Sequence, residues 1–225
     1  MSNYDHKIIP NIKVQETINT IRSNTSRYYE ILVITKEDEK PRIETTYNKI
    51  EIHIGNIENG PDLWHELTHV KMLTEQGMIL HPYPKGTDNI QEYYAFTNII
   101  TNIVYDIYVD VELYFSHKEI DEEYYDRKYR AYCIFLNKNR RVEGLQEELQ
   151  CAIIELIKEY CKVLTNISNR NIDGLKKYQD NSISKQRQEI EKWLNRTIFA
   201  RQYEWISYHD LYLREKKVGV KDDSC

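Results

Sequence analysis

Hydrophobic and polar residues alternate over the first quarter of the chain and recur at helical spacing over most of the rest. Residues 30–36 form an apolar run bounded by charged residues, which predicts a buried strand. Residues 42–47 are rich in β-branched side chains and predict a second strand. In residues 50–54 isoleucine alternates with Glu51 and His53, which is typical of a strand with one buried face. The pattern therefore predicts a small N-terminal sheet.

Helical spacing surrounds and follows this sheet. Residues 13–23 predict a first helix, and a second begins at Pro61, because proline suits the first position of a helix. Gly77 is the natural end of this second helix. Two prolines and a glycine in residues 81–86 predict a loop, after which a long helix runs from 87 or 88 to about 115.

The rest of the chain is expected to be all-helical, in segments near 120–136, 143–165 and 181–214. The expected fold class is therefore α+β: a small N-terminal β-sheet leads into a helix and is followed by a mostly α-helical C-terminal half.

The same pattern predicts three parts of the chain. Residues 1–117 would form a metal-binding core, residues 118–215 an α-helical extension, and residues 216–225 a disordered tail.

Composition and charge narrow the classes of partner. The 225 residues carry a formal net charge of -5 with acids and bases interspersed, which argues against a nucleic-acid partner. No run approaches the roughly 18 apolar residues of a membrane span. The four cysteines form no Cys-x-x-Cys pair, and together with the absence of an apolar N-terminal segment they predict a cytoplasmic protein with reduced thiols.

Candidate chemistry lies in the helix that begins near Pro61. His65 and His69 are four residues apart, so on a helix both can direct an imidazole nitrogen at one ion. Glu66 lies beside them, placed to take a proton from the attacking water and return it to a leaving amine. Zinc suits this chemistry because it polarises a carbonyl and activates water at neutral pH. The predicted cofactor is Zn²⁺.

Residues 64–70, Trp-His-Glu-Leu-Thr-His-Val, resemble the zincin metallopeptidases, whose fold has a small sheet leading into the active-site helix. The resemblance covers roughly residues 28–116. A metzincin would need Gly at position 72 and His at position 75, where this chain has Met72 and Glu75. The third metal ligand must therefore lie elsewhere.

The long helix supplies candidates for that ligand. Glu92, Asp106 and Asp110 share one face with apolar residues, and no Lys or Arg occurs between residues 86 and 117 to pair with them. Asp106 is the preferred third ligand, and Asp110, one turn later, is placed to accept the other ring N–H of His65 or His69 and so orient that ring. Glu92 is the alternative third ligand, while Asp110 and Glu112 are less favoured.

Both candidate ligands, Asp106 and Glu92, lie in stretches that resemble known metallopeptidases. The Asp106 and Asp110 pair resembles the glutamate zincins, in which a carboxylate four residues after the acidic ligand orients a histidine. Residues 102–106 are similar to the Asn-x-x-x-Asp stretch of some prokaryotic metallopeptidase-like domains. Residues 92–95 are similar to the Glu-x-x-Ala stretch of membrane-type and regulator-cleaving zincins.

The resemblance implies a zinc-dependent metallopeptidase that acts on a peptide or protein substrate. By β-augmentation, the substrate backbone would lie along the strand at residues 50–54. Two alternatives stay open: a catalytically silent zincin-fold binding module, and a zinc hydrolase acting on a non-peptide bond. The residue that stabilises an oxyanion is unassigned, and surface positions are expected for the candidates His81, Tyr83, His117 and His209. Oligomeric state has no signature in the sequence.

Overall fold

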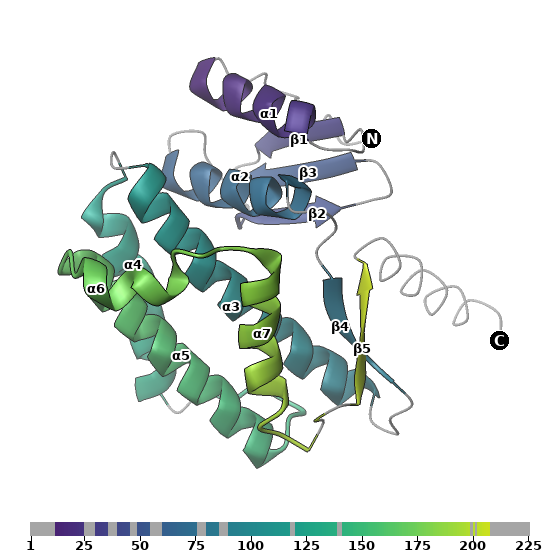
Figure 1. Cartoon of the computed structure of the whole chain (residues 1–225). Coiled ribbons are helices and arrows are strands. Elements are labelled where there is room, and N and C mark those ends of the chain that lie inside the picture. The colour runs from purple at the N-terminus through teal and green to yellow at the C-terminus, as the bar shows by residue number, and fades with distance from the viewer. Residues whose placement is uncertain are drawn as a thin grey trace. The chain divides into compact units, whose positions relative to one another are not determined.

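Most of the described strands lie in the N-terminal part of the chain, helices make up most of the rest, and one strand follows the last helix (Figure 1). The computed structural model describes residues 12–24, 30–35, 40–45, 49–54, 60–75, 80–85, 90–117, 120–138, 141–198, 200 and 202–207. The fold class is α+β, as predicted. The chain divides into two compact units, residues 1–81 with 206–225 and residues 82–205.

A three-stranded sheet forms the centre of the first unit. Its strands are β1 (Glu30–Thr35), β2 (Arg42–Thr45) and β3 (Lys49–Ile54), in the order β1-β3-β2. β3 pairs in parallel with β1 and antiparallel with β2. Because both edges of β3 are occupied, the expectation that a substrate backbone pairs with residues 50–54 is wrong.

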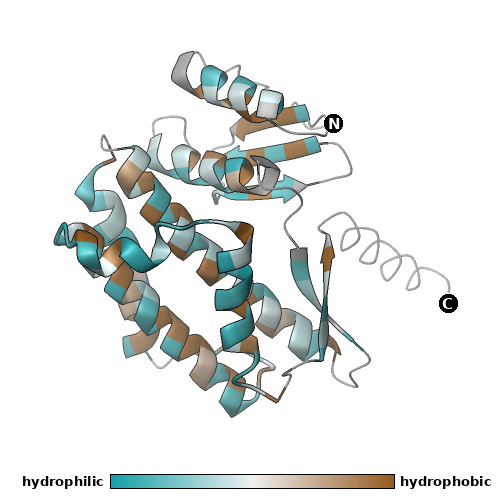
Figure 2. Cartoon of the chain, viewed as in Figure 1, coloured by the Kyte–Doolittle hydropathy of each residue, from teal (hydrophilic) through white to brown (hydrophobic). Residues whose placement is uncertain are grey.

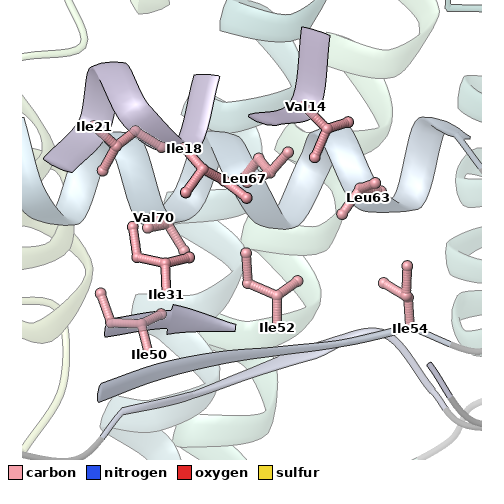
Figure 3. Packing of buried hydrophobic residues seen from close by; sticks show 10 residues of the cluster. All are labelled: Val14, Ile18, Ile21, Ile31, Ile50, Ile52, Ile54, Leu63, Leu67 and Val70. Carbon is pink, nitrogen blue, oxygen red and sulfur yellow. The ribbon is translucent and has the colours of Figure 1, made fainter. Parts of the chain in front are cut away.

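Two helices, α1 (Ile12–Asn24) and α2 (Gly60–Glu75), pack on one face of this sheet. Figure 3 shows their apolar side chains meeting those of β1 and β3 in one layer. The cluster consists of Val14, Ile18, Ile21, Ile31, Ile50, Ile52, Ile54, Leu63, Leu67 and Val70. As predicted, the isoleucines that alternate along β3 lie on the buried face of the sheet.

The other face of the sheet is less exposed to solvent than the sequence pattern indicates. Figure 2 shows hydrophilic and hydrophobic bands alternating along β3. The alternation predicts that Glu51 and His53 are exposed to solvent, and Glu51 is half-buried. His53, however, has only 6% of its surface exposed.

The second unit is mainly helical. Its helices are α3 (Ile90–Ser116), α4 (Glu122–Asn137), α5 (Glu147–Ser168), α6 (Ile172–Leu175), the 3-10 helix η1 (Lys176–Tyr178) and α7 (Ile183–Leu194). α3 is 27 residues long and is buried on several sides, as expected of a predominantly apolar helix. Within the described residues, no helix has a stretch long and apolar enough to cross a membrane.

Two strands lie where the sequence predicted a loop and a helix. β4 (Leu80–Pro84) lies in the predicted loop 81–86, and β5 (Tyr203–Ser207) lies in the predicted helix 181–214. They form a two-stranded sheet, in which each strand keeps an outer edge where proline needs no hydrogen-bond partner. Aromatic and β-branched residues in β5 favour the strand. The predicted tail, 216–225, lies outside the described residues.

The structural division of the chain differs from the predicted one. α3 packs against α5 and α7 within the second unit, and the boundary between the units falls after His81 rather than after residue 117. The apolar faces of α3 explain this grouping, because they are buried by helices that follow in sequence. The predicted functional division at residue 117 stays a prediction.

A buried ion pair ties three helices of the second unit together. Asp110 of α3 is fully buried, and its two carboxylate oxygens lie 2.9 and 3.0 Å from Nζ of Lys128 of α4. Tyr160 of α5 donates a hydrogen bond to the same carboxylate. The sequence indicated no local cation for Asp110, and α4 supplies one.

We expect Lys128→Met to lower the free energy of unfolding by about 3–5 kcal/mol, because it leaves a buried carboxylate without its cation. The double variant Lys128→Met with Asp110→Leu should recover most of this loss, since it removes the charge as well. Urea denaturation measures both, with Lys162→Met on an exposed position of α5 as the control. A loss for Lys128→Met no larger than that of the control would contradict this account.

Candidate metal centre

α2 places the two motif histidines on the side of the helix opposite its sheet-facing residues. Leu63, Leu67 and Val70 belong to the apolar core, and at about 100° per residue the side chains of His65 and His69 project the other way. His65 is buried and His69 is half-buried. The helix therefore separates its structural face from the face that carries the candidate chemistry.

The two imidazoles converge on one point. Nε2 of His65 lies 3.1 Å from Nε2 of His69, and the ring centroids are 4.7 Å apart with an interplanar angle of 80°. Two ligand atoms of a tetrahedral zinc ion, with bonds of about 2.0–2.1 Å, are separated by about 3.3 Å. The observed separation matches that spacing, and the same nitrogens can instead share one proton in a hydrogen bond. The pair fits two zinc ligands.

Glu66 lies next to His65 on α2 and is buried, with 8% of its surface exposed. A buried carboxylate is costly unless it is paired or has a chemical role. Thr68, between the two histidines, donates its hydroxyl to the carbonyl of Trp64 at 2.8 Å. That bond satisfies the hydroxyl within the helix and leaves His65, Glu66 and His69 as the ionisable groups of the motif.

Asp106, the predicted third ligand, lies on α3 in the second unit and is half-buried. It is close enough to Tyr132 and Tyr160 for its charge to act on both phenols. Burial raises the pKa of Tyr132, and the carboxylates of Asp106 and Asp110 add to the rise. Both phenols therefore stay protonated, and each can donate a hydrogen bond.

Glu92, the alternative third ligand, is buried and contacts the start of α5. Its carboxylate accepts a hydrogen bond from the backbone N–H of Gln146 at 2.6 Å and from the side-chain amide of Gln146 at 3.3 Å. Gln146 is the N-cap of α5 and makes no side-chain cap bond of its own. Glu92 thus stabilises the N-terminus of α5.

Asp110, predicted to orient a histidine ring, is engaged with Lys128 and Tyr160 in the second unit. Glu112, the least favoured acid, accepts hydrogen bonds from Ser116 at 2.8 Å and Asn181 at 3.2 Å. These contacts give both carboxylates structural roles. The identity of the third ligand, and the role of Asp110 toward a histidine, stay predictions.

The candidates for oxyanion stabilisation differ in exposure. His81 is buried, with 1% of its surface exposed, so the predicted surface position is wrong for this residue. Tyr83 and His117 are half-buried. His209 lies outside the described residues. The exposure of these residues does not identify which of them would stabilise an oxyanion.

Sequence reasoning missed the partners of the acids on α3. Lys128, Gln146 and Tyr160 come from helices that are 18 to 54 residues away in sequence. Periodicity identifies the buried face of a single helix, but it does not identify which later helix covers that face. The sequence indicates only weakly that Lys128 lies near the buried side of α4, because Lys128 follows Tyr124 and Tyr125 on a mainly polar helix.

Glu92→Ala should lower the free energy of unfolding by about 0.5–2 kcal/mol, as expected when a helix N-terminus loses its cap, and should leave the zinc content unchanged. Glu148→Ala, at an exposed position in the first turn of α5, is the matched control. Denaturation and elemental analysis measure the two quantities. Loss of zinc at unchanged stability would instead identify Glu92 as the ligand.

Comparisons with protein-family models, with curated proteins and with solved structures found no match to this chain. The resemblance to zincins therefore stays a prediction from the residues of the motif.

Proposed function

We propose that this protein is a zinc-dependent metallopeptidase that hydrolyses peptide bonds. One observation carries the proposal: two histidine Nε2 atoms lie 3.1 Å apart on a helix that also carries a buried glutamate between them in sequence. Two converging imidazoles and an adjacent carboxylate match the requirements of metal-assisted hydrolysis.

The residues have distinct roles in this proposal. His65 and His69 hold the ion, and Glu66 takes a proton from the attacking water and returns it to the leaving amine. When bound, zinc polarises the substrate carbonyl and lowers the pKa of water to about 7. Glu66 precedes His69 by three residues and follows His65 directly, so its carboxylate is carried by the same turn of α2 as the two histidines.

Asp106 is the third ligand that we propose. Among the acids on α3, Glu92 and Asp110 are buried and engaged with Gln146 and with Lys128, respectively. Moving either carboxylate to an ion would break those contacts, at a cost of a few kcal/mol. Asp106 is one helical turn before Asp110, so the ion pair of Asp110 also fixes the helical phase of Asp106.

The substrate in this proposal is a peptide or protein segment in an extended conformation. Since β3 is central, a substrate strand would have to pair with the outer edge of β1 or β2. The proposed location is the cytoplasm, in agreement with the free thiols of Cys133, Cys151 and Cys161.

Two other functions use the same residues. A catalytically silent binding module would keep the histidines for structure, but the buried Glu66 favours the enzyme, because a structural site does not need a base. A zinc hydrolase acting on a non-peptide bond would use the same catalytic groups and differ in its substrate.

We expect the isolated protein to contain zinc at the motif on α2, and His65→Ala with His69→Ala to lower its zinc content by one ion per chain. Asp106→Ala should weaken zinc binding by more than the roughly 10 to 100-fold typical of residues that only orient a ligand, whereas Asp110→Asn should fall within about that range. Elemental analysis and competition with a chelator measure both. An unchanged zinc content in the double histidine variant would refute the site.

Glu66→Gln should retain zinc and the fold but reduce hydrolysis of a peptide library by at least about 100-fold, because the nearly isosteric amide cannot accept a proton. Glu16→Gln, at an exposed position on α1, is the control. A binding module would be indifferent to the change. If wild-type protein cleaved no peptide and both variants bound the same partner as wild type, the peptidase proposal would fail.

A further inference from the structure

A second group of potential metal ligands lies on the face of the sheet opposite α1 and α2. Glu44 of β2 is directly opposite Glu51 of β3 in the antiparallel register, and His53 follows two residues later on β3. Side chains two residues apart on a strand share a face, so all three point away from Ile52 and the apolar core.

The ligand atoms of this group are close together. Nε2 of His53 lies 3.5 Å from Oε2 of Glu51 and 3.9 Å from Oε1 of Glu44. One ligand atom from each residue lies within 4.8 Å of the others. The shorter distance is near the separation of about 3.3 Å between two ligand atoms of a tetrahedral zinc ion, and the exposed side chain of Glu44 can move inward.

His53 is the most constrained member of the group. Its imidazole is buried in the sheet surface with 6% of the residue exposed, so little conformational entropy is lost when it binds. An imidazole with two carboxylates is a nitrogen and oxygen donor set, which suits zinc and similar transition metals. Calcium and magnesium prefer sets made only of oxygen.

Two carboxylates placed directly opposite each other repel, and the sheet compensates with nearby cations. Arg42 pairs with Glu44 at 2.8 Å, and Lys49 pairs with Oε1 of Glu51. Arg42 and Glu44 are exposed, and pairs of that kind contribute about 0–1 kcal/mol. Oε2 of Glu51 faces the imidazole rather than the lysine. Arg42 and Lys49 therefore compete with a bound cation but do not exclude it.

We propose that Glu44, Glu51 and His53 form a binding site for a divalent transition-metal cation of the zinc type, separate from the motif on α2. The cation would bridge β2 and β3 and replace the repulsion between the two glutamates with a shared ligand. The role of this cation would be to stabilise the sheet on which α2 packs. The proposal of this second site does not depend on the hydrolase proposal.

Zinc titration by calorimetry of the His65→Ala, His69→Ala protein tests the proposal, because the motif on α2 then contributes no binding. We expect one remaining zinc equivalent, bound at least about tenfold more weakly after His53→Ala. Glu44→Gln, an exposed change that does not endanger the fold, should also weaken binding, whereas Glu16→Gln on α1 should not. Calcium should not displace the zinc.

Lys49→Met separates a metal site from a simple network of ion pairs. Removal of the competing cation should strengthen zinc binding several-fold if Glu51 is a ligand. If Glu51 only pairs with Lys49, the substitution should leave zinc binding unchanged. That result, or zinc binding by Glu44→Gln as tight as by its parent, would overturn the proposal.

Discussion

The contact between α2 and the three-stranded sheet fixes the rotation of α2 about its axis, and with it the direction of every side chain in the metal motif. Burial of Leu63, Leu67 and Val70 contributes about 1.5–3 kcal/mol for each side chain. A hydrogen bond such as the one the two histidines can share contributes only about 1 kcal/mol. The core therefore determines the helical phase, and the convergence of His65 and His69 is a consequence of it.

Buried charge organises the second unit in a different way. Asp110 is fully buried and would destabilise the fold without Lys128, so α4 has to lie where its lysine can reach α3. Tyr160 adds the constraint for α5, and Glu92 fixes where α5 begins. Apolar burial drives these helices together, while the acids of α3 select one arrangement among those that apolar packing allows.

The elements that sequence analysis predicted well are those whose signals are local. The alternation of Ile50, Ile52 and Ile54 and the boundaries of α2 required only the period of a strand and the residues that begin and end a helix. β4 and β5 were missed because a two-stranded sheet depends on pairing between segments more than a hundred residues apart.

The same difference between local signals and tertiary contacts applies to the candidate site. The spacing of His65 and His69 predicted that both rings can face one ion, and their Nε2 atoms lie 3.1 Å apart. The partners of Glu92 and Asp110, and the burial of His53, arise from tertiary contacts, which no period in the sequence encodes.

The pairing of β4 with β5 has a consequence for how the chain is built. The backbone N–H of Lys85 donates to the carbonyl of Gln202 at 2.8 Å, so the chain leaves and returns at nearly the same point. Residues 86–201 are therefore inserted between β4 and β5, two strands that pair with each other. A tight turn of two residues could close the gap in their place. Conversely, a circular permutant that begins within the helical segment would break no strand of the β1-β3-β2 sheet.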